Sequence, residues 1–172
     1  NESRNQYYDR LPEIVQDYMD KVNAKLGTDY KLFNYYGAED AEVVIVAMGS
    51  VNDTIEETVD HLLKQGKKVG LVKVRLYRPF SAKALVEALP KSVKRIEVLD
   101  RTKEAGSIGE PLYLDVVAAL RDTEFANVPV FTGRYGLGSK DTTPKDIVAV
   151  FENTEKKRFT VGIVDDVTHL SL

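Results

Sequence analysis

The stretch VVIVAMGS, residues 43–50, gives the clearest indication of the fold class of this chain. Its first six residues are continuously apolar, as expected of a parallel strand that is covered on both faces. Gly49 and Ser50 then turn the chain into a helix, for which Ser50 is a suitable N-cap and acidic residues fill the first turns. Apolar residues recur along this helix at three- and four-residue spacing until Gly66 ends it. A buried strand followed at once by an amphipathic helix predicts an α/β fold.

The same alternation continues to the end of the chain. We expect further strands at residues 69–76, 94–100, 128–132 and 159–164, and further helices beginning at Ser81, Pro111 and Pro144. The helix that follows Glu110 should bury Leu112, Val116, Val117 and Leu120. Pro129, near the start of its strand, favours an edge position for that strand. Repeated strand–helix units predict a three-layer αβα architecture around a mainly parallel, open, twisted sheet.

Two segments flank this α/β pattern. An apolar stripe predicts a helix over residues 11–26, which Gly27 would end, and the aromatic-rich residues 30–37 would form an edge strand or an extended arm. We therefore divide the chain into three regions. They are an N-terminal helical arm and connector at 1–40, the α/β domain at 41–155, and the start of a connection to a further domain at 156–172.

Composition excludes several classes of function. The chain has 172 residues, no cysteine and a net charge of −3, so it carries no basic field for nucleic acid. No apolar run approaches the roughly 20 residues needed to span a bilayer. Without thiolates the chain can hold neither a Cys-ligated iron–sulfur cluster nor a thiolate zinc site, and the lack of disulfides fits a cytoplasmic location. The only two histidines, His61 and His169, lie far apart, which argues against a hydrolase triad or a His-rich metal site.

The two ends of the chain suggest a longer polypeptide. The sequence begins with Asn1 rather than methionine and stops at Leu172, just after an apolar stretch. Both ends are expected to be cuts within a larger protein, with a processed mature protein as the alternative.

Several motifs carry a family resemblance. The strand with its Gly-Ser turn, the basic strand GKKVGLVKVRLYRPF (66–80) and the acidic-ended strand IEVLDR (96–101) resemble the C-terminal domain of the transketolase group of thiamine-diphosphate enzymes. Further stretches are more similar to the second domain of pyruvate:ferredoxin (or flavodoxin) oxidoreductases. They are YKLFNYYGA (30–38), LDRTKE (99–104), GEPLY (109–113), GRYGLGSK (133–140) and FTVGIVDDVT (159–168).

The resemblance implies a domain of a large enzyme that oxidatively decarboxylates a 2-oxoacid, in the first instance pyruvate, to acetyl-coenzyme A and CO2. Such an enzyme would use thiamine diphosphate, magnesium and iron–sulfur clusters, pass electrons to ferredoxin or flavodoxin, and form a homodimer. The thiamine and cluster motifs of the family are absent from this chain, so no catalytic residue is carried over. The chain alone is expected to be inactive, to hold no cofactor and to contact the other domains of its own polypeptide.

Two stretches are candidate binding sites. Arg134, Gly136, Gly138, Ser139 and Lys140 form a glycine-rich loop with flanking cations, which would either cradle a phosphate such as one of coenzyme A or act as a connector packed on a neighbouring domain. The loop lacks the third glycine of a dinucleotide fingerprint and the lysine–serine order of a P-loop. Gly49 and Ser50 at a helix N-terminus would bind an anion or form an ordinary cap.

Three other groups favour structural roles. Residues 100–104 place alternating charges after a strand and suggest salt bridges within the chain or between domains. Asp165 and Asp166, if in a strand, would point to opposite faces and so make a poor metal site. His61 is expected to be solvated on the polar side of its helix.

Two rival functions remain open from the sequence. One is a stand-alone, flavodoxin-like module that binds a small molecule. The other is the C-terminal domain of a different thiamine enzyme, such as a transketolase or a branched-chain dehydrogenase subunit. The length of the native gene product discriminates among the readings, because only the oxidoreductase needs downstream cysteine motifs for its clusters.

Overall fold

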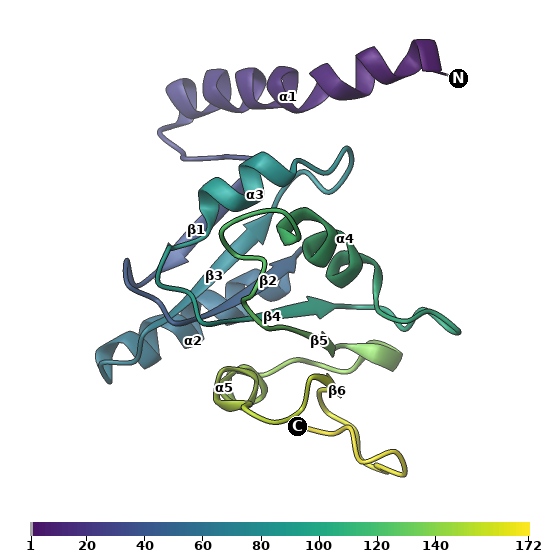
Figure 1. The fold of residues 1–172 in the computed structure, drawn as a ribbon. Helices are drawn as coiled ribbons and strands as arrows, with labels where there is room; N and C mark the ends of the chain where they lie inside the picture. Colours follow the sequence, from purple (N-terminus) through teal and green to yellow (C-terminus); the bar gives the residue numbers. More distant parts are fainter. Residues whose placement is uncertain (1) are drawn as a thin grey trace.

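The structure is a computed structural model that describes residues 2–172, and it confirms the α/β fold (Figure 1). The helices are α1 (Asn5–Leu26), α2 (Val51–Lys64), α3 (Ala82–Ala88), α4 (Pro111–Leu120) and α5 (Pro144–Glu152), with single 3-10 turns at Glu2–Arg4 and Leu137–Ser139. The strands are β1 (Phe33–Gly37), β2 (Val43–Met48), β3 (Val69–Val74), β4 (Arg95–Asp100), β5 (Val130–Arg134) and β6 (Arg158–Thr160).

The six strands form one sheet in the order β1-β3-β2-β4-β5-β6. Every pair is parallel except β1 with β3, so within residues 2–172 the only antiparallel strand lies at an edge. The segment around residues 30–37 is therefore an edge strand, one of the two forms expected for it.

Helices cover both faces of the sheet and make three layers. On one face, α3 and α4 bury Leu85, Leu112 and Val116 against alternate residues of the strands. On the other face, α2 and α5 bury Ile55 and Ile147 in a second core. Strands buried on both sides explain the continuous apolar runs in the sequence.

Local signals fixed several helix boundaries. Thr143 and Asp146 form a reciprocal capping box at the start of α5, and Pro111 and Pro144 occupy first-turn positions. Ser81 caps α3 by accepting a hydrogen bond from the Ala84 N–H at 3.2 Å. These positions were expected from the residue types alone.

Two expectations about the sheet were wrong. The strand that follows Pro129 is not at an edge, because β6 pairs with β5 on its outer side. Pro129 itself precedes β5, and its carbonyl accepts the Ile96 N–H at 3.0 Å, so the missing N–H of proline interrupts no ladder. The last strand ends at Thr160 rather than at residue 164, and Val164 is 82% exposed in the bend that follows.

Two helices also differ from expectation. α1 begins at Asn5, six residues before the predicted start at Leu11. The first turns face solvent and lack the apolar periodicity on which the prediction was based. Val117 in α4 was expected in the core but is 39% exposed. Apolar residues lie on nearly all sides of α4, so its sequence does not indicate which face is buried.

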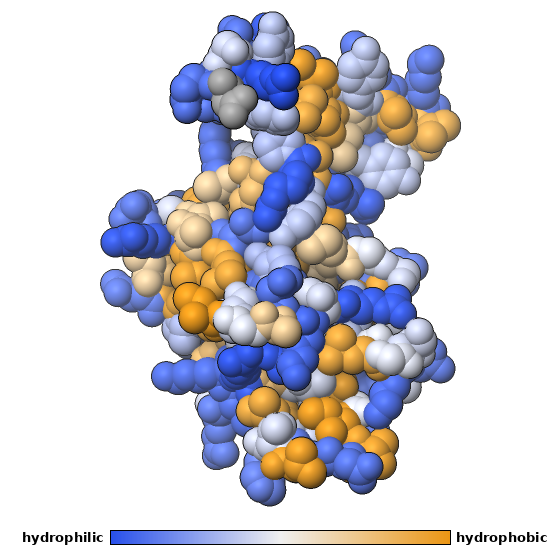
Figure 2. Space-filling model, turned by 90° about the vertical axis from the view of Figure 1, so that its right-hand side faces the viewer, coloured by the Kyte–Doolittle hydropathy of each residue, from blue (hydrophilic) through white to orange (hydrophobic). Residues whose placement is uncertain are grey.

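The helix α1 lies apart from the other helices, across the β1 end of the sheet (Figure 1). Val15 and Met19 pack against the core, and the side chains of Gln16 and Asn23 hold the following segment through hydrogen bonds to Leu32 and Tyr30. The other half of its apolar stripe is exposed: Ile14, Tyr18, Val22 and Leu26. Figure 2 shows apolar side chains at this end of the molecule and again at the opposite end.

Candidate functional site: a cationic pocket at the carboxyl edge of the sheet

Polar residues end three neighbouring strands at one edge of the sheet. The register pairs Asp100 of β4 with Arg134 of β5, and Arg134 with Thr160 of β6. Residues paired in this way point to the same face of a sheet, here the face that α4 covers. The carboxyl edge of a parallel sheet is where α/β proteins commonly bind ligands.

Asp100 fixes the start of α4. Its two carboxylate oxygens accept the backbone N–H groups of Leu112 and Tyr113 at 3.0 and 3.2 Å. Burial raises the pKa of Asp100, and these two hydrogen bonds act in the opposite direction. Asp100 is therefore a structural residue that joins the end of β4 to the first turn of α4.

Arg134 and Glu110 form a buried ion pair next to this helix start. The Arg134 Nε lies 2.5 Å from Glu110 Oε1, and the two residues are 5% and 1% exposed. The other Glu110 oxygen accepts the Glu104 N–H at 2.6 Å, and a terminal nitrogen of Arg134 lies 3.5 Å from the Thr160 hydroxyl. The pair joins β5, β6, α4 and the loop before α4.

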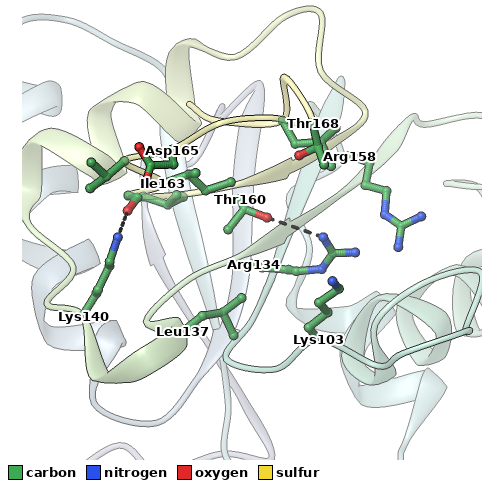
Figure 3. A pocket seen from close by; sticks show the side chains of 13 residues that line it. Lys103, Arg134, Leu137, Lys140, Arg158, Thr160, Ile163, Asp165 and Thr168 are labelled. Atoms are coloured by element: carbon green, nitrogen blue, oxygen red, sulfur yellow. Dashed lines mark hydrogen bonds between the residues drawn. The ribbon is translucent and has the colours of Figure 1, made fainter.

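A pocket of about 530 Å³ opens beside this ion pair. One wall is cationic and contains Lys103, Arg134 and Arg158, whose guanidinium lies 3.9 Å from the same Glu110 oxygen. Figure 3 shows these three side chains gathered at one end of the pocket, while Lys140 and Asp165 lie at the other end. The apolar lining comes from Leu137, Val161, Ile163, Val164 and Leu170.

The glycine-rich loop is only partly in this pocket. Arg134 and Lys140 both line it, as does Leu137 between them. Gly136, Gly138 and Ser139 adopt left-handed backbone conformations and are not among the lining residues. The Lys140 ammonium donates a hydrogen bond to the Gly162 carbonyl at 2.7 Å, which ties the loop to the C-terminal segment. The two predicted cations thus line the same pocket from opposite ends, where Arg134 is engaged with Glu110 and Lys140 with the Gly162 carbonyl.

Gly49 and Ser50 lie elsewhere, at the end of β2. Ser50 occupies the N-cap position of α2, but its backbone is helical and its side chain makes no capping hydrogen bond. Gly49 has a φ of 81°, which explains the glycine at this turn. Neither residue lines the cationic pocket.

Sequence reasoning missed Arg158 and Glu110 as members of the site. Both stand at element boundaries: Arg158 begins β6, and Glu110 precedes the proline that opens α4. A search for charged residues at successive strand ends would have found Arg134 but not these two. The contacts of Arg158 and Glu110 with the site depend on tertiary packing. Lys103 was noted only as one of several alternating charges.

The two aspartates near the C-terminus are not in a strand. They follow a turn, and Asp166 accepts the N–H groups of Leu170 and Ser171 at 2.9 and 3.0 Å. The bond from Ser171 is the largest of the influences that lower the pKa of Asp166. Asp166 therefore shapes the final turn of the chain. Across residues 2–172, no three His, Asp or Glu side chains are arranged to hold a metal ion.

Comparison with known proteins places this chain in the class of 2-oxoacid oxidoreductase domains. Residues 41–147 match the family model of the pyruvate:ferredoxin oxidoreductase core domain II. The chain belongs to this family of domains.

Three relatives illustrate the relationship. The chain is 56% identical to a pyruvate:ferredoxin oxidoreductase of Moorella thermoacetica and 53% identical to a pyruvate-flavodoxin oxidoreductase of Enterobacter agglomerans, in each case over 99% of this chain and 15% of the relative. It is 55% identical to a mitochondrial pyruvate dehydrogenase [NADP(+)] of Euglena gracilis, over 99% of this chain and 10% of the relative. The chain thus spans a small part of the length of these proteins.

A solved structure supports the fold. The chain is similar to the 2-oxoglutarate:ferredoxin oxidoreductase of Magnetococcus marinus, a structure that holds 2-oxoglutarate, coenzyme A and succinyl-CoA, with a TM-score of 0.50 and 23% identity. The match covers 78% of this chain and 21% of that one. Within residues 2–172, every helix is too short or too polar to cross a lipid bilayer.

Proposed function

We propose that this chain is an interdomain scaffold within a longer 2-oxoacid:ferredoxin or flavodoxin oxidoreductase. The observation that carries the proposal is identity above 50% over 99% of the chain to pyruvate oxidoreductases of which it spans only 15%. The whole enzyme would oxidise pyruvate, transfer the acetyl group to coenzyme A, release CO2 and pass a pair of electrons to ferredoxin or flavodoxin.

The cofactors of that reaction would be bound by other parts of the polypeptide. Iron–sulfur clusters need thiolates, and the chain has no cysteine. The proposal therefore assigns thiamine diphosphate, magnesium and the clusters to the other domains, and no catalytic step to the residues of this one. A cytoplasmic homodimer is part of the same proposal.

The exposed face of α1 supports an interdomain role. Ile14, Tyr18 and Val22 line a hollow of about 540 Å³ together with Tyr30 and Arg75. Tyr18 is 64% exposed and Leu26 is 71% exposed. An exposed apolar patch of this kind commonly marks an interface. We assign it to contact with another domain of the same polypeptide, since the relatives are more than six times as long as this chain.

The length of the native polypeptide tests this proposal against a stand-alone binding module. The coding region around this chain should encode a protein of roughly the size of the relatives, with cysteine motifs for clusters outside this segment. An open reading frame that ends close to this chain on both sides would refute the scaffold and favour the stand-alone module.

The pocket also makes coenzyme A a candidate ligand of the intact enzyme. Its cations Lys103, Arg134, Lys140 and Arg158 offer charge-assisted donors to phosphate. Lys103→Gln/Arg158→Gln in the intact enzyme would then raise the Michaelis constant for coenzyme A by about tenfold and leave that for pyruvate unchanged. If the segment is only a connector, as its contacts with Glu110 and Gly162 favour, both constants should change together or not at all.

A further inference from the structure

The cationic wall of the pocket carries more positive than negative charge. Lys103, Arg134 and Arg158 line this end of the pocket, whereas the salt bridges of Arg134 and Arg158 both go to one carboxylate, Glu110, so cations outnumber the carboxylates paired with them. Asp165 cannot neutralise them, because it lies at the far end of the pocket beside Lys140 (Figure 3). A concentration of charge of one sign in a partly enclosed cavity attracts an ion of opposite charge.

Arg134 is also short of hydrogen-bond partners. It is 5% exposed, and its guanidinium has five N–H donors, of which the Nε donor binds Glu110. In the described part of the chain its terminal nitrogens meet only the Thr160 hydroxyl, at a long 3.5 Å. Figure 3 shows the guanidinium directed into the space between Lys103 and Arg158. The remaining Arg134 donors therefore face the pocket, where they can donate to an acceptor bound at that point.

The opposite wall is suited to an organic group. It is formed by aliphatic side chains, including Leu137, Val161 and Leu170. A pocket with an anion-binding end and an aliphatic wall, and a volume of about 530 Å³, is of the size that holds a small molecule rather than a bare ion.

We infer that this pocket binds the phosphate of a phosphomonoester whose organic part is apolar. A phosphomonoester carries close to two negative charges near neutral pH, so this excess of cations attracts it more strongly than it attracts a monocarboxylate. Guanidinium groups suit phosphate because two N–H donors bind two oxygens at once. The inference concerns this chain alone and holds whether or not coenzyme A is a ligand of a longer enzyme.

The test is calorimetric titration of the 172-residue chain with phenyl phosphate, inorganic phosphate and benzoate at pH 7.5. Phenyl phosphate should bind with one site per chain and more tightly than inorganic phosphate, because only the ester reaches the aliphatic wall. Benzoate should bind at least about tenfold more weakly than phenyl phosphate, since it has the same ring but one charge fewer.

Two variants with equal loss of charge locate the site. Lys103→Gln/Arg158→Gln removes two exposed cations of the pocket and should weaken phenyl phosphate binding by at least about tenfold. Lys91→Gln/Arg121→Gln removes two exposed cations that do not line the pocket and should leave binding unchanged. Near-ultraviolet circular dichroism of each variant verifies that the fold is retained.

Three results would overturn the inference. They are the absence of saturable binding of phenyl phosphate, binding of benzoate as tight as that of phenyl phosphate, and equal loss of binding in the two double variants. Saturable binding that depends on the pocket, with an unchanged Michaelis constant for coenzyme A in the intact enzyme, would support this site and reject only the coenzyme A role.

Discussion

Arg134, the last residue of β5, donates through its Nε to Oε1 of Glu110, the residue before α4, at 2.5 Å with both side chains buried. This contact joins a strand end to a helix start across the carboxyl edge of the sheet. The same Glu110 oxygen lies 3.9 Å from Arg158 of β6. One carboxylate therefore organises both the packing of this edge and the charge of the pocket beside it.

Removal of the Glu110 charge should destabilise the chain strongly. Glu110→Gln would leave the Arg134 guanidinium buried without its counter-charge, which costs about 3–5 kcal/mol when one partner of a buried pair is lost. Urea unfolding of the 172-residue chain, followed by circular dichroism, measures the change.

A matched surface variant controls for the loss of one glutamate charge. Glu42 pairs with Lys94 at 3.0 Å, but the Lys94 side chain is 69% exposed, so Glu42→Gln should cost less than about 1 kcal/mol. Equal effects of the two substitutions would show that the Arg134–Glu110 pair is no more important than a surface pair.

Gly133 should not tolerate a side chain. A Cβ at this position would overlap the Phe159 ring of β6 and lie 2.7 Å from Leu99 of β4. Gly133→Ala is expected to cost about 1–3 kcal/mol through overpacking. In a double-mutant cycle, Phe159→Leu should partly relieve this cost, so the double variant should be more stable than the sum of the single effects predicts. Strict additivity in urea unfolding would contradict the proposed clash.

Much of the architecture could be predicted from the sequence, because the deciding signals are local. The apolar run 43–48 predicts a strand that is buried on both faces. Thr143 and Asp146 predict a helix start independently of the tertiary contacts of that helix. The edge position predicted from Pro129 was wrong. Proline disrupts a central strand only where the ladder needs a backbone N–H, and Pro129 contributes only its carbonyl, which accepts the Ile96 N–H.

The site was harder to predict for a different reason. The glycine-rich loop predicted Arg134 and Lys140 as site residues. The rest of the pocket, however, is formed by residues outside this loop, including Lys103 and Arg158. Arg158 reaches it from another strand and belongs to no motif that marks a binding site, and Glu110 was noted only within GEPLY (109–113), as part of the family resemblance. Tertiary packing, rather than spacing along the chain, creates the charge excess.

Glu97 should make the stability of the chain depend on pH. Its carboxyl is fully buried in β4, and burial raises its pKa to about 8 although Arg95 Nε lies 2.8 Å away. An unfolded chain releases this proton near pH 4.5, whereas the folded chain retains it until about pH 8. The contribution of Glu97 to stability is therefore full below pH 4.5 and is lost as the pH rises to 8 and above.

Comparison with Glu97→Gln isolates this effect, since the other titrating groups are shared. The stability of the variant relative to the wild type, from urea midpoints at pH 5, 6.5 and 8, should increase as the pH rises. A difference that stays constant over this range would show that Glu97 has the same pKa in the folded and unfolded chains.

The exposed face of α1 should matter only in the longer protein. Tyr18→Ser/Leu26→Ser replaces two exposed apolar side chains, so the unfolding free energy of the 172-residue chain should change by less than about 1 kcal/mol. In the intact polypeptide the same substitutions should lower the thermal unfolding midpoint, because the proposed interdomain contact is lost. An intact protein with an unchanged midpoint would argue against α1 as a domain interface.

A pyruvate oxidation assay tests whether this chain is a non-catalytic domain of a 2-oxoacid oxidoreductase. The intact polypeptide and the 172-residue chain would each be incubated with pyruvate, coenzyme A, thiamine diphosphate, magnesium and an oxidised viologen as electron acceptor. We predict reduction of the viologen and formation of acetyl-coenzyme A by the intact polypeptide, and neither by the 172-residue chain. Turnover by the 172-residue chain alone, or an intact polypeptide that fails to oxidise any 2-oxoacid, would contradict the claim.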